Sequence, residues 1–119
     1  MSRIKKGVSA HRRHKKWIAL AKGHRAGMHS MFALAHESMM HALYYAYAHR
    51  RERKADMRRL WIARVGAASR ENGLTYGEFM NGLKKSGVTL DRKALAELAV
   101  REPSAFAELA ATAKAQSKG

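Results

Sequence analysis

The sequence contains no cysteine, one proline and only nine acidic residues among its 119 positions. The lack of cysteine excludes disulfide bonds and thiolate metal sites, as suits a protein of a reducing compartment. The scarcity of carboxylates leaves little with which to organise acid–base catalysis, and no glycine-rich phosphate loop or serine nucleophile motif is present. We therefore expect a protein that is not an enzyme and that needs no metal, cofactor or small-molecule substrate.

A long uninterrupted apolar run is also missing. Residues 26–48 contain no lysine or arginine and have the length of a membrane span, but three histidines, two serines and Glu37 interrupt them. Such polar groups have no partners in hydrocarbon, so we expect no contact with a membrane. The first residues contain no apolar segment typical of a secretory signal. We expect a cytoplasmic location, with an organelle as the open alternative, because an arginine-rich transit peptide would look partly similar.

Positive charge dominates what is present. The chain has 24 lysines and arginines, a net charge of +15 and a pI near 10.8. Residues 1–60 hold 15 basic and 3 acidic side chains, whereas residues 61–119 hold 9 and 6. So large an excess of one sign needs a polyanionic partner, which indicates a nucleic acid that is met mainly by the N-terminal half.

Helical patterns cover nearly the whole chain, and no segment alternates with the period of two that marks a strand. After a short tail, Ser9 is placed to cap a helix over residues 10–21, which Gly23 ends. The next helical pattern begins near Arg25 and meets no proline before Gly73. These signals predict an all-α fold with a long basic N-terminal helical extension.

Apart from Gly27 and Gly66, no residue obliges the long helical pattern to break, and we expect a kink near Gly27 or Arg50. Small and apolar residues recur there at spacings of three and four, namely Met28, Met31, Phe32, Ala35, Met39, Ala42 and Ala46. This spacing predicts an apolar stripe that packs against protein or against nucleobases and sugars. We expect no hydrophobic core within the cationic N-terminal half of the chain.

Beyond the long helix, the helix-end residues predict three short helices. Thr75 and Glu78 form a capping box, Asp91 caps the next helix, and Pro103 opens the last one. These helices carry apolar residues that we expect to form a small core with the end of the long helix. The predicted core residues are Leu60, Trp61, Val65, Leu95, Leu98, Ala99, Phe106, Leu109 and Ala113.

Two clusters of cations are the candidate contacts to nucleic acid. The first surrounds an aromatic side chain and consists of Arg3, Lys5, Lys6, Arg12, Arg13, Lys15, Lys16, Trp17, Lys22 and Arg25. The second lies on the long helix and consists of Arg50, Arg51, Arg53, Lys54, Arg58, Arg59, Arg64 and Arg70. Few acids neutralise either cluster, which favours phosphate contact over a solvated charged face. Trp17 either stacks on a base or packs against its helix neighbours.

Seven histidines invite a metal or catalytic interpretation, and the segment from His36 to His41 comes close to the zinc-protease pattern. That pattern needs its two histidines four residues apart on one helix face. A separation of five turns them roughly 140° apart around the helix. We expect the histidines to bind RNA through hydrogen bonds or to face solvent.

Residues 54–70, with the sequence KADMRRLWIARVGAASR, resemble the characteristic segment of the bacterial ribosomal protein L20 family. Further motifs of this family are similar and follow in the same order, so the resemblance covers essentially the whole chain. These motifs are Arg13-His14-Lys15-Lys16, Ala21-Lys22-Gly23, Asn81-Gly82-Leu83-Lys84-Lys85, and Asp91-Arg92-Lys93 with Leu95-Ala96. The resemblance implies a basic extension over residues 1–58 that penetrates RNA and a small globular α-helical domain over residues 59–119.

The resemblance further implies a structural constituent of the large ribosomal subunit that binds 23S ribosomal RNA directly and supports early assembly. It implies neighbouring large-subunit proteins as partners and, in some bacteria, repression of the protein's own messenger RNA. It adds four residues to the candidate RNA contacts, namely His14, Asn81, Lys84 and Lys85. The alternative function is that of a nonribosomal basic architectural protein that binds nucleic acid without sequence preference.

One feature departs from the family pattern. Family members carry several arginines or lysines in the region that corresponds to residues 28–48, where this chain has histidines, methionines and tyrosines. Tyr44, Tyr45 and Tyr47 can replace some phosphate contacts by stacking or through their hydroxyl groups, or they can pack into a core.

Overall fold

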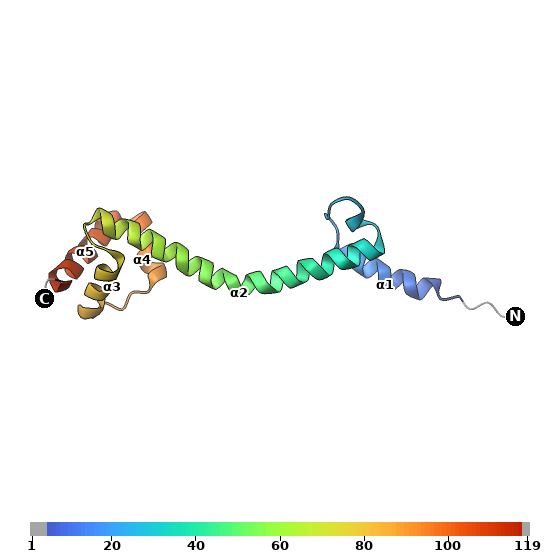
Figure 1. Cartoon of the computed structure of the whole chain (residues 1–119), viewed down its shortest axis with the longest axis horizontal. Helices are drawn as coiled ribbons and strands as arrows, with labels where there is room; N and C mark the ends of the chain where they lie inside the picture. The colour runs from blue at the N-terminus through green and yellow to red at the C-terminus, as the bar shows by residue number, and fades with distance from the viewer. Residues whose placement is uncertain (1–4, 118–119) are drawn as a thin grey trace. The chain divides into compact units, whose positions relative to one another are not determined.

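The computed structural model describes residues 5–117, which form one short 3₁₀ helix and otherwise only α-helices (Figure 1). The elements in chain order are α1 (Gly7–Leu20), η1 (Ala26–His29), α2 (Phe32–Glu71), α3 (Tyr76–Lys85), α4 (Arg92–Arg101) and α5 (Pro103–Ser117). No strand occurs in residues 5–117, and the predicted all-α class is confirmed. The chain divides into two compact units, Met1–Arg51 and Glu52–Gly119, and α2 contributes residues to both.

The first unit has a small core of its own, which corrects the expectation that the cationic half has none. The end of α1 packs on the start of α2 through small side chains, which let two helices approach closely. The buried residues are Ala21, Ala35 and Met39, and the partly buried ones packed against them are Trp17, Ile18 and Ala42. Part of the predicted apolar stripe is therefore satisfied within the protein, whereas Met28 and Met31 are exposed.

The N-terminus of α1 also differs from the prediction. The helix begins at Gly7 with Lys6 as its N-cap and without a side-chain cap, so Ser9 lies inside the first turn. A backbone hydrogen bond from Ala10 N to Lys6 O, 3.3 Å long, carries the helical pattern past the predicted cap. The predicted end is confirmed, because Gly23 takes a φ of +88° just beyond the helix.

The long helix starts later than its sequence pattern indicates. η1 and the residues around it separate α1 from α2, with Ala26 at a φ of +53° in the left-handed region. Next to it, a Cβ added at Gly27 would lie 3.3 Å or less from side-chain atoms of Met31 and Leu34, so this position in η1 leaves little room for a side chain. α2 then runs as one helix through Arg50, so the helical pattern is interrupted near Gly27 and continuous at Arg50.

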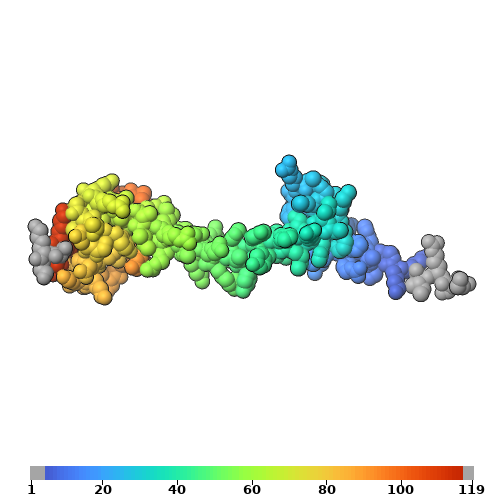
Figure 2. Space-filling view, viewed as in Figure 1, coloured from blue at the N-terminus to red at the C-terminus, as the bar shows by residue number. Residues whose placement is uncertain are grey.

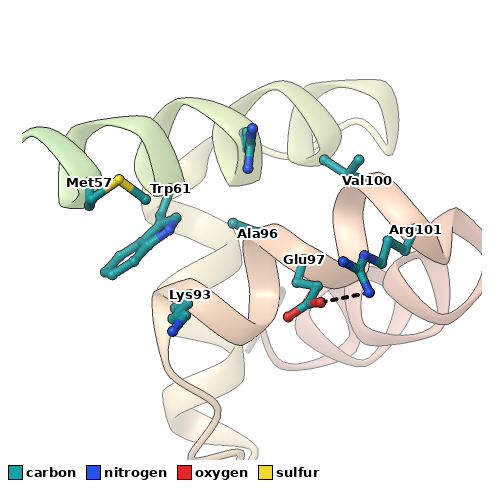
Figure 3. A pocket seen from close by; sticks show the side chains of 8 residues that line it. Met57, Trp61, Lys93, Ala96, Glu97, Val100 and Arg101 are labelled. Atoms are coloured by element: carbon teal, nitrogen blue, oxygen red, sulfur yellow. Dashed lines mark ion pairs between the residues drawn. The ribbon is translucent and has the colours of Figure 1, made fainter.

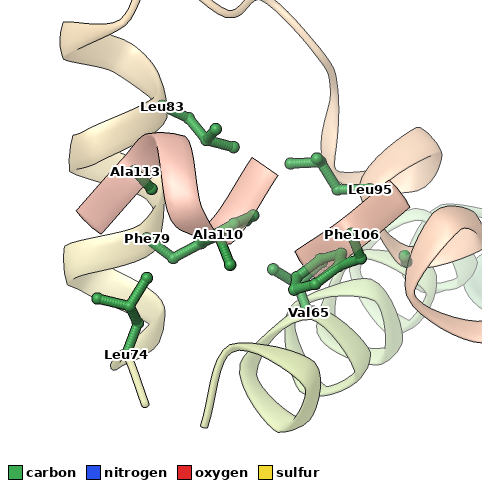
Figure 4. Close-up of a cluster of buried hydrophobic side chains, with 9 residues drawn as sticks. Val65, Leu74, Phe79, Leu83, Leu95, Phe106, Ala110 and Ala113 are labelled. Carbon is green, nitrogen blue, oxygen red and sulfur yellow. The ribbon is translucent and has the colours of Figure 1, made fainter. Parts of the chain in front are cut away.

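The second unit is built around a core contributed by all of its helices (Figure 4). The buried residues are Val65, Leu74, Phe79, Leu83, Leu95, Ala96, Phe106, Ala110 and Ala113. The rings of Phe79 and Phe106 stack at the centre with centroids 4.8 Å apart. In the space-filling view, the yellow and red segments of α3 and α5 form one closely packed surface (Figure 2).

The predicted core is confirmed at Val65, Leu95, Phe106 and Ala113, and Ala99 and Leu109 pack against it. Leu98 is half-buried outside this cluster, and the edge of the core on α2 also differs from the prediction. Leu60 is exposed and Trp61 is only half-buried, whereas Val65 is fully buried. The reason is angular: five residues separate Leu60 from Val65, which turns Leu60 about 140° away from the core face. Trp61 lies four residues before Val65, about 40° away, and therefore packs against the margin of the core.

The predicted helix ends of the second unit are confirmed. Thr75 N donates to Glu78 Oε2 over 2.8 Å, and Glu78 N donates to Thr75 Oγ1 over 3.3 Å, which completes the capping box of α3. The Thr75 hydroxyl group also donates a 2.8 Å hydrogen bond to Glu78 Oε2, and the two donations from Thr75, first from its backbone and then from its hydroxyl group, lower the pKa of Glu78 from its ordinary value. Asp91 Oδ1 accepts a 2.8 Å hydrogen bond from Ala94 N at the start of α4, and Pro103 is the first residue of α5.

Candidate nucleic-acid interface

The cations predicted from the sequence are available to a partner. Within residues 5–117 every lysine and arginine of the two predicted clusters is exposed, as are Asn81, Lys84 and Lys85. Among these described residues, Arg59 alone forms an ion pair, with Asp56 at 3.2 Å. Arg3, another predicted contact, lies outside the described residues. An array of exposed guanidinium and ammonium groups with almost no neutralising carboxylates suits a polyanion.

The face of α1 that meets α2 is aromatic. The ring of His14 stacks on Phe32 with centroids 3.7 Å apart, and Trp17 meets His36 edge-on at 4.5 Å. Just beyond α1, His24 Nδ1 lies 2.7 Å from Ser38 Oγ on α2.

His14, His24 and His36 make contacts within the first unit and are half-buried, whereas the other four histidines are exposed, as expected. Binding of RNA by any of them stays a prediction. Trp17 is half-buried in the same cluster, in line with the interpretation of this residue as an anchor. Because this side of α1 is occupied, its exposed cations remain for a partner, namely Arg12, Arg13, Lys15 and Lys16.

In α2, all ten residues from 51 to 60 are exposed. This stretch carries Arg51, Arg53, Lys54, Arg58 and Arg59, and successive residues of a helix are rotated by about 100°. The cations therefore surround the helix instead of lining one stripe. A helix that is charged on all sides can contact phosphates of more than one RNA segment, which suits the irregular surfaces of folded RNA.

Just before this stretch, α2 presents aromatic rings to solvent. Tyr44, Tyr45 and Tyr47 are all more than half exposed, which excludes core packing as their fate in this structure. The rings of His41, Tyr45 and His49 follow one another along one helix face, with centroids 6.5 and 5.8 Å apart. The predicted set contains neither of these two histidines, although their spacing of four residues on either side of Tyr45 was readable from the sequence.

Arg51 connects the aromatic segment with the cationic one. Its guanidinium carbon lies 3.5 Å from the centroid of the Tyr47 ring, and its Nη1 donates a 3.2 Å hydrogen bond to Tyr47 O. A guanidinium held flat on an exposed ring continues the aromatic surface and keeps its charge, which are the two properties that contact bases and phosphates.

In the second unit, Asn81 and Lys84 line a shallow pocket of about 420 Å³ at the junction between the end of α3 and the start of α4. Arg92 lines the same pocket, and its Nε donates a 2.8 Å hydrogen bond to the Tyr76 hydroxyl group. This bond fixes the start of α4 against the start of α3. Arg92 was missing from the predicted contacts, although it belongs to the Asp91-Arg92-Lys93 motif that the sequence analysis singled out.

Other kinds of site were also sought in the described part of the chain. Residues 5–117 contain no group of three histidine, cysteine or acidic side chains that could hold a metal ion. His36 packs on Trp17, whereas His41 is exposed and lies 3.9 Å from Glu37, so the two histidines of the near-zinc pattern have separate environments. None of the helices in this range is both long and apolar enough to cross a membrane.

Fold and surface together define a class of small, strongly basic, all-helical proteins that present their cations outward. Comparison with known proteins is more specific, since the family model described as ribosomal protein L20 matches residues 3–109. The large ribosomal subunit protein bL20 of Dehalococcoides mccartyi is 59% identical over 115 residues, which is 97% of either chain. That of Acidithiobacillus ferrooxidans is 52% identical over 116 residues, or 98% of either chain.

The chain belongs to the ribosomal protein L20 family. Proteins of this family are structural constituents of the ribosome, and this chain is accordingly a structural protein and not an enzyme. The match over residues 3–109 includes both the cationic first half and most of the second unit. The alternative of a nonribosomal architectural protein rested on composition alone. It loses its support because the family match is more specific than composition.

Proposed function

We propose that this chain binds large-subunit ribosomal RNA directly. The observation that carries the proposal is the exposure of every predicted lysine and arginine within residues 5–117, with a single ion pair among them. The relatives are named as proteins of the large ribosomal subunit, and a structural protein of that particle must be held in a largely anionic environment. Each phosphate contact releases condensed cations and so contributes favourably to binding.

Within this proposal the two parts of the chain have different roles. Residues 1–58 form the RNA-penetrating extension, since they carry most of the excess charge and the segment of α2 that is exposed all round. Residues 59–119 form a folded body that recognises the shape of an RNA junction through Arg64, Arg70, Asn81, Lys84 and Lys85. Phosphate contacts supply affinity, whereas a rigid surface with a fixed arrangement of donors supplies selectivity.

The same exposed cations also serve assembly of the large subunit and repression of the protein's own messenger RNA. The protein assembles with ribosomal RNA in the cytoplasm as part of the large subunit, beside neighbouring ribosomal proteins. It acts early in assembly, because a cationic helix placed between RNA segments stabilises their approach before other proteins are added. Repression of its own messenger needs no separate site, because an RNA that imitates the ribosomal junction would meet the same donors.

The salt dependence of RNA binding tests the proposed roles. The dissociation constant of the full chain for large-subunit ribosomal RNA should rise steeply with salt, since each phosphate contact contributes roughly 0.7 to 0.9 to the slope. Removal of residues 1–49 should flatten this slope and weaken affinity more than selectivity over a random duplex. If the shortened chain binds every RNA equally well, recognition resides in the extension and the assigned roles are wrong.

A further inference from the structure

A second pocket of the C-terminal unit lies between α2 and α4 and is separate from the predicted RNA contacts except at Arg64. It measures about 360 Å³ and is open to solvent. Figure 3 shows the indole of Trp61 beside Met57 on α2, facing Lys93 and Ala96 of α4. The remaining lining residues are Glu97, Val100 and Arg101. The pocket thus has an aromatic and aliphatic wall with charged groups around it.

The position of Trp61 is unusual for so large an apolar side chain. It packs against the core on one side, yet it is only half-buried and lines an open pocket. Met57, one helical turn before it, is exposed, so the apolar wall continues toward solvent. An indole supported from behind by a folded core is held rigidly, and little conformational entropy is lost when a planar ring stacks on it.

The charges around the pocket favour an anionic partner. Glu97 is the only acid among the lining residues, and Arg101 Nη1 pairs with its Oε1 at 3.1 Å, as the dashed line in Figure 3 marks. Arg64 and Lys93 remain without an ion-pair partner among the described residues. The local surplus is therefore two positive charges beside an aromatic ring.

We propose that this pocket binds one unpaired nucleobase of the RNA, stacked on Trp61, with the flanking phosphates at Arg64 and Lys93. The proposal rests on the RNA-binding function above and specifies a base contact within it. Aromatic side chains with adjacent cations are the usual platform for unstacked bases, whereas a purely apolar peptide would leave both cations without partners. The pocket therefore adds recognition of a base to an interface otherwise made of phosphate contacts.

Matched variants of the full chain test this proposal. Trp61→Phe keeps an aromatic ring, whereas Trp61→Leu keeps only apolar packing against the core. Stacking on one base implies that the leucine variant loses roughly 5- to 100-fold in affinity for large-subunit ribosomal RNA, and that the phenylalanine variant stays close to the parent. Lys93→Gln should lower the salt slope by about one, whereas Lys114→Gln, an exposed charge outside the pocket, should not.

The fluorescence of Trp61 provides a second test, which holds even if the Trp61→Leu variant does not fold. In a Trp17→Phe chain, Trp61 is the sole tryptophan and reports its own surroundings by fluorescence. Single-stranded oligoadenylate should quench this emission, whereas a duplex of equal length should quench it far less. In the ribosomal RNA complex, chemical methylation should show one unpaired base that is protected by the parent and exposed in the Trp61→Leu complex.

The outcomes separate this proposal from the broader one. If the parent chain does not bind ribosomal RNA, the proposed function itself fails. If the parent binds, but the leucine and phenylalanine variants bind equally well and Trp61 emission does not respond to single strands, RNA binding stands and the base pocket is refuted.

Discussion

The contact between α3 and α5 should fail when Gly82 is replaced by alanine. A Cβ at this position would lie 2.5 Å from Ala113 O and 2.8 Å from Ala113 Cα. Both are backbone atoms of α5, so no side-chain rotation relieves the overlap and the two helices must separate. Overpacking of a core costs about 1–3 kcal/mol, and a forced backbone shift belongs at the upper end of that range.

Alanine offsets part of this loss, because it favours a helix over glycine by about 1 kcal/mol. The expected net change is a loss of about 2 kcal/mol in the free energy of unfolding. For a unit of this size, that lowers Tm by roughly 8–16 °C. Thermal unfolding of the full chain, followed by circular dichroism, measures the change.

Gly77 is the matched control, because it lies in the same helix and a Cβ there meets nothing within 4 Å. Gly77→Ala should leave Tm unchanged or raise it, by up to about 1 kcal/mol of stability. If Gly82→Ala is as stable as Gly77→Ala, the close approach of α3 and α5 is wrong.

Three further substitutions test the second unit by unfolding experiments. Phe106→Ala should cost about 3–5 kcal/mol, because its ring is buried and stacks on Phe79; a loss below about 1 kcal/mol would show that the core is misplaced. Asp91→Ala should cost about 1 kcal/mol through loss of the cap of α4, and no change in urea midpoint would contradict that cap. The lowered pKa of Glu78 implies a stabilising contribution that is present above its ordinary value of 4.5 and is lost as pH falls through the lowered pKa. Thr75→Ala should reduce this part of the acid dependence only partly, because the Thr75 N–H that has the larger effect remains, whereas in a Thr75→Ala/Glu78→Gln chain it should vanish; an unchanged pH profile in that double variant would exclude the capping box as its source.

The helix ends of the second unit could be predicted because their signals are local. The Thr75–Glu78 capping box, the Asp91 cap and the Pro103 start each depend on a few adjacent residues, and all three are confirmed. The same kind of signal failed at Ser9, where the helix begins at Gly7, three residues nearer the N-terminus than predicted. A cap residue shows where a helix can begin, whereas the flanking residues decide whether it does.

Tertiary contacts were less accessible from the sequence. The packing of α1 on α2 relies on alanines and on the rings of His14 and His36. A hydropathy scale counts histidine as hydrophilic and so gives no sign of this packing. Nothing in the spacing of these residues indicates that the segment around η1 folds back and places Phe32 beside His14 and His36 beside Trp17. Likewise, the apolar sequence around Trp61 predicted a buried indole, but the exposure of this ring depends on how α4 packs against α2, which the sequence does not indicate.

For the candidate interface, residue type was the reliable guide. Charge excess and the family resemblance together selected lysines and arginines that are all exposed within the described residues. The same reasoning missed Arg92, because its hydrogen bond to Tyr76 joins residues 16 positions apart. It also missed the column of His41, Tyr45 and His49, because it weighed residue type and not the spacing of four residues that the sequence shows. Which of the exposed cations touch RNA stays a prediction for experiment.

The central claim is direct and selective binding to large-subunit ribosomal RNA, and hydroxyl-radical footprinting of that RNA tests it most directly. The purified chain, added to protein-free large-subunit RNA at moderate salt, should protect the backbone at a compact set of positions where several RNA helices meet. Small-subunit RNA under the same conditions should show no such set. Protections that are absent, or that are equally dense on both RNAs, would contradict the claim.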